Sequence, residues 1–250
     1  MPDDKNANPL RDQQYKDSSN LCTRVNLHER YSTNTYGWHR WIFDQIDLLP
    51  TARILELGCG PGLLWRENLY RVPDGWDITL SDFSEGMVDE AREHLGSTSH
   101  PFCFEIIDAQ SIPFDDNCLD AVIANHMLYH VPDIPRALAE ICRVLRPGAQ
   151  FYASTVGLQH MIELRKLATS YEPSGELWQQ LTAGPFNLEN GLDQLQAHFA
   201  AVTLMRYEDD LLITEPEPLV EYILSSGNAA SLSVEEKDRM AALVLSLIHI

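Results

Sequence analysis

Three carboxylates and one amide hold equivalent places in the first half of this 250-residue chain. Each stands at the end of a short apolar run, and a glycine-rich turn follows the first of them; the four are Glu56, Asp82, Asp108 and Asn125. Carboxylate and amide oxygens accept hydrogen bonds from hydroxyl and amino groups. The pattern therefore predicts a site for a ligand that carries such groups.

The glycine-rich turn is Gly58-Cys-Gly-Pro-Gly62, between an apolar run at residues 54–57 and a helix-compatible segment at residues 63–70. Glycine lets the backbone approach a ligand closely, and a helix N-terminus aims free N–H groups at it. A dinucleotide fingerprint requires G-x-G-x-x-G, but Leu63 occupies the place of the third glycine and Pro61 removes one donor. We expect a ligand without a pyrophosphate at Gly58, Cys59, Gly60 and Gly62.

The two aspartates follow predicted strands at residues 77–81 and 102–107. Asp82 comes 20 residues after Gly62, where a carboxylate can accept hydrogen bonds from a ribose diol. Its alternative role is that of a surface acid that caps the next helix. The alternative role of Asp108 is to form a turn.

The elements that must position these residues alternate between strand and helix. Further strands are predicted at residues 119–124 and 150–155, with a helix at about 133–145 between them. Five such alternations predict an α/β fold with a doubly wound, mostly parallel sheet and right-handed crossovers. Ligands of such sheets bind at the carboxyl ends of the strands, where the four polar residues fall.

Three longer motifs resemble those of one enzyme family. Asp82-Phe-Ser-Glu-Gly-Met87 is similar to D-x-S-x-x-M, and Asp108-Ala-Gln-Ser-Ile-Pro-Phe114 to D-A-x-x-L-P-F. Residues 137–148 are close to al-x-E-x-x-RVLkPGG, with Ala149 in place of the second glycine. Together with the glycine turn, over roughly residues 28–165, they resemble class I S-adenosylmethionine-dependent methyltransferases of the methyltransferase domain type 11 family.

The resemblance implies a Rossmann-like fold, S-adenosyl-L-methionine as cofactor, and direct methyl transfer to an unidentified small-molecule acceptor. It implies that Asp108 accepts from the adenine amino group, that the Ala109 N–H meets a ring nitrogen, and that Phe83 and Met87 flank the ring. An N-terminal aromatic residue, Tyr31 or Trp38, would contact the methionine part or else only pack on the sheet. The expected cofactor-binding residues are Tyr31, Glu56, Gly58, Cys59, Gly60, Gly62, Asp82, Phe83, Met87, Asp108, Ala109, Gln110 and Asn125.

Catalysis by such an enzyme requires a base only where the nucleophile must lose a proton. His126 and His130 are the candidate catalytic residues, and Tyr129 and His160 the candidate substrate residues; the alternative is that the histidines only shape their loops. No metal site is expected, because the chain has no H-E-x-x-H or paired-cysteine pattern. Two other functions stay open: an NAD-type oxidoreductase on a Rossmann-like fold, and a non-catalytic S-adenosylmethionine-binding protein.

Composition narrows the class of partner. The net charge is −19, and the 18 Lys and Arg residues form no cluster, so neither nucleic acid nor an anionic membrane is expected as a partner. Five dispersed cysteines are typical of reduced thiols, which predicts a cytoplasmic protein. The oligomeric state is not indicated by any motif.

The chain is expected to comprise a poorly ordered segment at 1–27 and a single methyltransferase domain at 28–250. That domain divides into a cofactor-binding core at 50–156, a helical cap for the substrate at 157–200, and a C-terminal region at 201–250. The C-terminal region is expected to hold a sixth strand at 201–207 and a short extended piece at 211–214. Other helices are predicted at 35–49, 156–171, 176–182, 188–199, 216–225 and 234–247. The final antiparallel strand of the family is absent, so we expect a fragment that has lost it.

Overall fold

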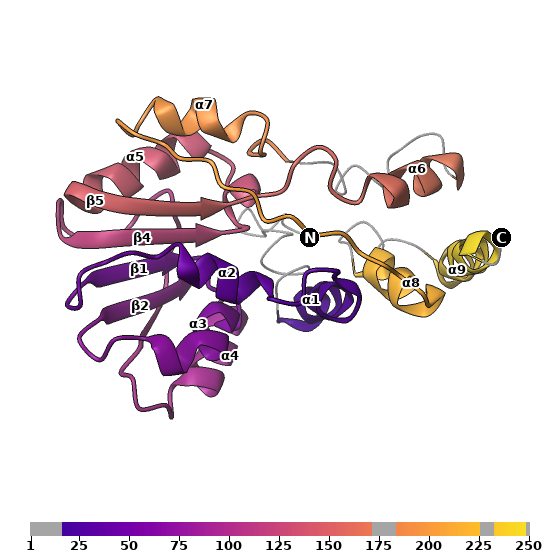
Figure 1. Ribbon diagram of the computed structural model, residues 1–250, viewed down its shortest axis with the longest axis horizontal. Helices are drawn as coiled ribbons and strands as arrows, with labels where there is room; N and C mark the ends of the chain where they lie inside the picture. The colour runs from indigo at the N-terminus through magenta and orange to yellow at the C-terminus, as the bar shows by residue number, and fades with distance from the viewer. Residues whose placement is uncertain (1–16, 172–183, 226–232, 249–250) are drawn as a thin grey trace, which may run out of the picture. The chain divides into compact units, whose positions relative to one another are not determined.

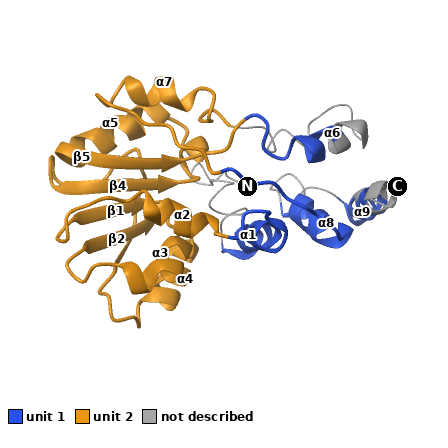
Figure 2. Cartoon of the chain, in the orientation of Figure 1, with its two compact units in different colours: residues 1–35, 158–183, 208–250 blue, residues 36–157, 184–207 orange. Residues whose placement is uncertain are grey.

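The computed structural model describes residues 17–171, 184–225 and 233–248, which form two compact units (Figure 2). Unit 2 comprises residues 36–157 and 184–207 and contains the sheet. Unit 1 comprises residues 1–35, 158–183 and 208–250, of which the described parts are mainly helical. The sequence predicts one domain from residue 28 onward, whereas the structure divides the same residues between two units.

The sheet of unit 2 has five parallel strands in the order β3-β2-β1-β4-β5 (Figure 1). Its strands are β1 (Arg53–Leu57), β2 (Asp77–Asp82), β3 (Cys103–Ile106), β4 (Leu119–Asn125) and β5 (Leu145–Ser154). The order reverses between β1 and β4, and the carboxyl ends of these two strands form the switch point where open α/β sheets bind ligands. The predicted doubly wound parallel sheet is confirmed.

Helices cover both faces of this sheet. Helix α5 (Ile134–Val144) packs Ala137, Leu138 and Ile141 on one face together with Leu55 and Val122. On the other face lie α2 (Trp38–Asp44), α3 (Leu63–Asn68) and α4 (Glu85–Leu95), whose core residues include Phe43, Trp65 and Leu95. A one-turn helix, η2 (Leu69–Arg71), follows α3. The two faces of the central strands are therefore both buried, as their high apolar content requires.

Local signals set most element boundaries. Ser84 caps α4 by accepting a hydrogen bond from the Met87 N–H, and Asp133 caps α5 by accepting from the Arg136 N–H. Strand β5 begins at Leu145 directly after α5, five residues before the predicted start. A register shift between its pairings of Leu145 and Gln150 accommodates Arg146-Pro-Gly148, where Gly148 has a φ of 83°.

The predicted sixth strand at 201–207 is wrong, because these residues form no ladder with the sheet. Leu204 and Met205 are 45% and 52% exposed, so the segment has no buried face of the kind that a strand needs. Helix α7 (Gly191–Gln196) precedes it and is shorter than predicted. Within the described ranges the sheet contains parallel pairs only.

Unit 1 consists of α1 (Ser19–Tyr31), α6 (Ile162–Tyr171), α8 (Pro216–Leu224) and α9 (Val234–Ile248). Its core joins Leu27 and Tyr31 of α1 to Leu219, Tyr222 and Ile223 of α8. The predicted poor order of residues 19–27 is therefore wrong, because tertiary packing stabilises this polar helix. The extended piece at 211–214 forms one antiparallel bridge, Leu211 with Ser32. Residues 1–16 and the predicted helix at 176–182 lie outside the described residues.

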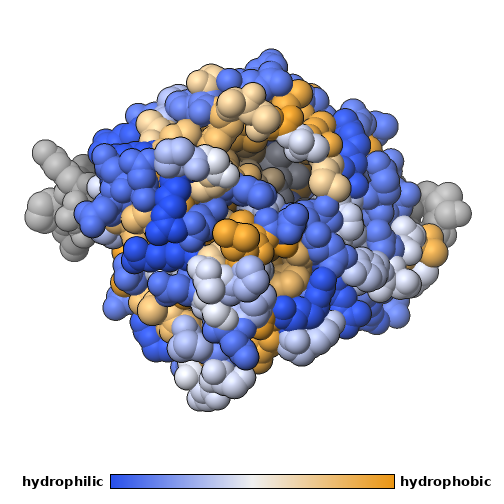
Figure 3. All heavy atoms as spheres, turned by 60° about the vertical axis from the view of Figure 1, so that its left-hand side comes forward, coloured by the Kyte–Doolittle hydropathy of each residue, from blue (hydrophilic) through white to orange (hydrophobic). Residues whose placement is uncertain are grey.

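The face drawn in Figure 3 is covered mainly by hydrophilic side chains, with hydrophobic ones in separate groups among them. None of the described helices combines the length and the apolar character that crossing a membrane requires.

Candidate active site

The glycine turn between β1 and α3 has the backbone conformation that its sequence predicts. Gly58, Gly60 and Gly62 have φ values of 69°, 53° and 77°, in the left-handed region that favours glycine. A Cβ atom at Gly58 would lie 2.7 Å from Cβ of Met127, and one at Gly62 would lie 2.7 Å from Cδ1 of Leu95. The turn therefore needs glycine both for its conformation and for its close packing.

Asp82 lies at the end of β2, beside this turn. Its Oδ2 accepts the Gly60 N–H at 3.1 Å, and its Oδ1 accepts the Ser84 N–H at 2.9 Å. Burial raises the pKa of Asp82 even though these backbone bonds favour the ionised form. A third backbone hydrogen bond, from Phe83, acts on the same carboxylate. Because an ionised carboxylate has about four acceptor positions, these bonds still leave capacity for a hydroxyl of a ligand. The alternative reading of Asp82 as the cap of the next helix is wrong, because Ser84 caps α4.

Glu56 is a buried acid behind the turn, with 2% of its surface exposed. Its Oε2 accepts the Trp65 Nε1–H at 2.6 Å, and the Asn125 side chain also bonds to this carboxyl. Burial raises the pKa of Glu56 to about 7, and the nearby Asp82 carboxylate contributes in the same direction. Burial likewise raises the pKa of Cys59, which lies in the turn. The ends of β1, β2 and β4 thus bring Glu56, Asp82 and Asn125 around one glycine turn.

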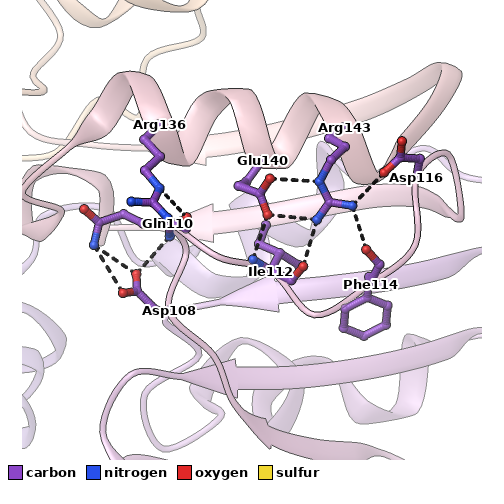
Figure 4. Close-up of polar contacts among 8 residues, drawn as sticks. All are labelled: Asp108, Gln110, Ile112, Phe114, Asp116, Arg136, Glu140 and Arg143. Carbon is purple, nitrogen blue, oxygen red and sulfur yellow. Dashed lines mark hydrogen bonds and ion pairs between the residues drawn. The ribbon is translucent and has the colours of Figure 1, made fainter.

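Asp108 lies just after β3, at the start of a loop that leads towards β4 (Figure 4). Its Oδ1 accepts the backbone N–H of Gln110 at 2.9 Å and the Gln110 Nε2–H at 3.0 Å. The Ser111 N–H also bonds to the Asp108 carbonyl at 2.9 Å, so the predicted turn is present. Asp108 therefore shapes its own turn, and its carboxylate lies beside the Gln110 side chain.

Helix α5 holds this loop through Arg143 (Figure 4). The guanidinium donates to both carboxylate oxygens of Glu140 at 2.8 Å and to the carbonyl oxygens of Ile112 and Phe114 at 2.8 and 2.7 Å. It also reaches Asp116 at 2.8 Å, and Glu140 accepts the Ile112 N–H at 2.9 Å. The planar fork of arginine suits this set of acceptors, which lysine could not bond all at once.

The residues after β4 turn sharply at His126. This non-glycine residue has a φ of 50°, and such outliers cluster at functional sites. Ser154 at the end of β5 holds the turn, because its carbonyl and hydroxyl oxygens both accept the His126 N–H, at 3.2 and 3.1 Å. The Ser154 hydroxyl also donates to Oδ1 of Asn125 at 3.1 Å. The ends of β4 and β5 therefore fix the backbone of His126, one of the two predicted catalytic residues.

Aromatic rings gather around this turn. The His126 ring lies 5.0 Å from the Trp38 ring and 6.4 Å from the Tyr129 ring, and Tyr129 lies 4.5 Å from His130. The one-turn helix η3 (Leu128–His130) holds the last two, and Tyr207 lies 5.4 Å from Trp38. We call Trp38, His126, Tyr129, His130 and Tyr207 the aromatic cluster. Trp38 is one of the two aromatic residues expected to contact the methionine part of the cofactor, and in the structure its ring lies beside that of the predicted catalytic residue His126.

Other predicted residues have different surroundings. Phe83 is 40% exposed, whereas Met87 is 1% exposed. Tyr31 and His160 belong to unit 1, so their predicted roles in the site stay predictions. The Tyr31 hydroxyl donates to Glu215 at 3.3 Å, and the His160 ring stacks on that of His28 at 5.8 Å. Burial lowers the pKa of His160 to about 4.

Three supporting residues are absent from the sequence prediction, namely Trp65, Ser154 and Arg143. Trp65 and Ser154 have no motif of their own, since their roles depend on how α3 and β5 pack beside β1 and β4. Arg143 lies inside a motif that the sequence displays, al-x-E-x-x-RVLkPGG, and its spacing of three residues from Glu140 was an available signal. Spacing of three residues places both on one face of a helix.

Comparisons with known proteins agree with this geometry. Residues 55–153 match a family model described as methyltransferase domain. A demethylmenaquinone methyltransferase of Symbiobacterium thermophilum is 36% identical over 117 residues, which cover 46% of this chain and 46% of that protein. A ubiquinone/menaquinone biosynthesis C-methyltransferase of Geotalea daltonii is 30% identical over 116 residues, or 46% of this chain and 49% of that protein. Each match spans about half the length of the curated relative.

A solved structure is similar over a larger part of the chain. A SAM-dependent methyltransferase of Thermotoga maritima superposes with a TM-score of 0.52, at 20% identity, over 74% of this chain and 79% of that one. At this identity the likeness shows the fold alone. The matched residues 55–153 contain the end of β1, all of β2 to β4, α5 and most of β5, which carry the glycine turn, Glu56, Asp82, Asp108 and Asn125. This part of the chain is therefore similar to the methyltransferase domain family, and the chain has a Rossmann-like fold similar to that of the solved methyltransferase structure.

Proposed function

We propose that the protein is an S-adenosylmethionine-dependent methyltransferase that transfers a methyl group to a small-molecule acceptor by direct displacement. The observation that carries the proposal is the bond between Asp82 and the glycine turn. The Gly60 N–H holds one carboxylate oxygen beside three glycines in the left-handed region. A nucleoside with a free ribose diol fits a carboxylate fixed at this point.

The donor and acceptor groups of unit 2 fit the parts of this cofactor. Asp82 would accept from the ribose hydroxyls, and Asp108 from the adenine amino group. Glu56 and Asn125 lie behind the turn, where their carboxyl and amide oxygens could accept hydrogen bonds from the amino group of the methionine part of the cofactor. The exposed Phe83 ring would cover one side of the base. Met87 is buried in the structure, so we propose for it a supporting role under that ring.

When bound, S-adenosylmethionine supplies an electrophilic methyl group on a sulfonium, so no covalent catalyst is required from the protein. The residues of this chain bind the cofactor and the acceptor, orient them towards each other and exclude water from the site. Good orientation alone lowers a reaction barrier by roughly 7–11 kcal/mol. The aromatic cluster lies at the carboxyl end of β4, where it would orient the acceptor. His126 or His130 would take a proton only where the acceptor atom carries one that must leave.

Isothermal titration calorimetry with S-adenosylhomocysteine tests the cofactor, with NAD as the control. Micromolar binding of the nucleoside and none of NAD supports the proposal. Binding of NAD alone would favour an oxidoreductase, which the structure supports poorly because Leu63, at the place of the third glycine, is buried within α3. No binding of either ligand by folded protein would contradict the assignment of the turn.

Turnover on a panel of acceptors separates an enzyme from a protein that only binds the cofactor. The panel should include a demethylated quinone, because one relative is a demethylmenaquinone methyltransferase. Labelled methyl groups on any acceptor support catalysis, whereas cofactor binding without turnover over the whole panel favours the binding protein. A small-molecule partner, rather than nucleic acid or a membrane, remains part of this proposal, and the strongly negative charge supports it. A cytoplasmic location is also proposed, from the five dispersed cysteines.

A further inference from the structure

Gln110 stands out because it uses every polar group that it has. Its backbone N–H and its side-chain Nε2–H both donate to Asp108, at 2.9 and 3.0 Å from Oδ1. Its Oε1 accepts the Asp133 N–H at 3.2 Å, and its backbone carbonyl accepts Nε–H of Arg136 at 2.8 Å. Figure 4 shows Gln110 between Asp108 and Arg136. The side chain therefore joins the carboxylate after β3 to the start of α5.

The bonds fall unequally on the two oxygens of Asp108. Oδ1 receives two donors at 3.0 Å or less, whereas Oδ2, among the residues that the structure describes, receives only the longer contact from Nε2, at 3.3 Å. This arrangement fixes the rotation of the carboxylate and leaves acceptor positions on Oδ2. The glutamine amide is itself fixed, since Oε1 is bonded to the Asp133 N–H and cannot exchange places with Nε2 without losing that bond.

We propose that Gln110 is a positioning residue that makes the site selective for a 6-amino purine over a 6-oxo purine. The inference rests on the proposed function, in which Asp108 meets the base. A fixed acceptor-only carboxylate pairs with an amino group and repels a carbonyl oxygen. Gln110 thus acts on the cofactor through Asp108 rather than by touching it, which refines its expected place among the cofactor-binding residues.

Helix α5 supports the same loop at its far end, through Arg143 and Glu140. The loop is therefore held at two separate places, and removing the Gln110 amide leaves the second in place. A Gln110→Leu variant is expected to fold, because Gln110 is only partly buried and its backbone bonds do not depend on the side chain. This separation makes selectivity measurable apart from stability.

The experiment measures dissociation constants for S-adenosylhomocysteine and S-inosylhomocysteine by calorimetry. Gln110→Leu is expected to weaken adenine binding by about tenfold, the usual loss for one bond to a charged group, and to leave inosine binding nearly unchanged. The ratio of the two constants should therefore fall by about tenfold. Gln110→Glu should lower the ratio at least as far, because it keeps the Oε1 acceptor but places a second carboxylate beside Asp108.

Gln194→Leu is the matched control. Gln194 also donates from Nε2, to the Pro185 carbonyl at 3.0 Å and to Asn190, but it lies on α7 and away from Asp108. Its loss should leave the ratio unchanged. A ratio that stays at the wild-type value in Gln110→Leu, with both ligands weakened equally, would show a merely structural role and overturn the inference. Failure of the wild type to bind S-adenosylhomocysteine would instead reject the proposed function.

Discussion

Replacing Glu56 with glutamine should make the protein more stable at neutral and alkaline pH. Glu56 is 2% exposed, and its pKa is raised from 4.5 to about 7 by burial. Glutamine keeps the size of the side chain and an oxygen that can accept the Trp65 indole N–H, but it never ionises. The variant therefore removes the cost of a buried charge while retaining the bond at 2.6 Å.

The sign and size follow from the linkage between proton binding and folding. The raised pKa means that the folded protein holds a proton which the unfolded chain has released between about pH 4.5 and 7. The stabilisation from Glu56 is therefore fully present below the unfolded pKa and is lost as pH rises through 7. A shift of this size corresponds to roughly 3 kcal/mol, most of which falls between pH 5 and 8.

Urea unfolding followed by tryptophan fluorescence measures this effect, since Trp65 belongs to the core beside Glu56. The free energy of unfolding is compared at pH 5 and pH 8 for wild type and Glu56→Gln. The free energy of unfolding of the variant minus that of wild type should be about 2–3 kcal/mol larger at pH 8 than at pH 5. Glu105→Gln, which removes an exposed carboxyl on β3, is the matched control for the loss of one acidic group. Equal pH dependence in wild type and Glu56→Gln would refute a largely protonated Glu56 at neutral pH.

Other substitutions test the remaining parts of the site and the fold. Asp82→Ala should weaken S-adenosylhomocysteine binding by about 1–3 kcal/mol in calorimetry, through loss of charged hydrogen bonds; unchanged affinity in a folded variant would remove Asp82 from the site. Gly60→Val should abolish that binding, because a β-branched residue strongly disfavours a φ of 53°; measurable binding would contradict the role of the turn. Arg143→Lys should lower the free energy of unfolding by about 1–2 kcal/mol in urea, since lysine replaces only some of the bonds; no loss would show that the loop does not need them. His160 should stay neutral down to about pH 4 in an NMR titration, because burial lowers its pKa; a midpoint near 6.5 would contradict its buried position.

The sequence predicts the parts of the site that depend on local chemistry. The left-handed glycines, the Ser84 cap and the turn at Asp108 each follow from residues a few positions apart. The strand ends could also be predicted, because β1, β2 and β4 are rich in apolar residues and are buried on both faces over most of their length. These features need no knowledge of distant contacts.

Features set by distant contacts could not be predicted in the same way. The apolar residues at 201–207 are compatible with a strand, but no sheet edge pairs with them and Tyr207 packs on Trp38 instead. Residues 19–27 are too polar to indicate a stable helix, and only packing against α8 explains α1. Likewise, the positive φ of His126 is held by hydrogen bonds to Ser154, which is 28 residues away.

The interleaved order of the two units has a consequence for synthesis on the ribosome. Tyr31 at the end of α1 bonds to Glu215, which lies 184 residues further along the chain. At a usual rate of 5–20 residues per second, on the order of 10–40 s passes before that partner is made. The residues from Tyr36 to Tyr207 that form unit 2 emerge in that interval. The apolar side of α1 therefore stays exposed, or bound to a chaperone, during this interval. It can pack on α8 only after the residues of unit 2, which lie between the two helices in the sequence, have been synthesised.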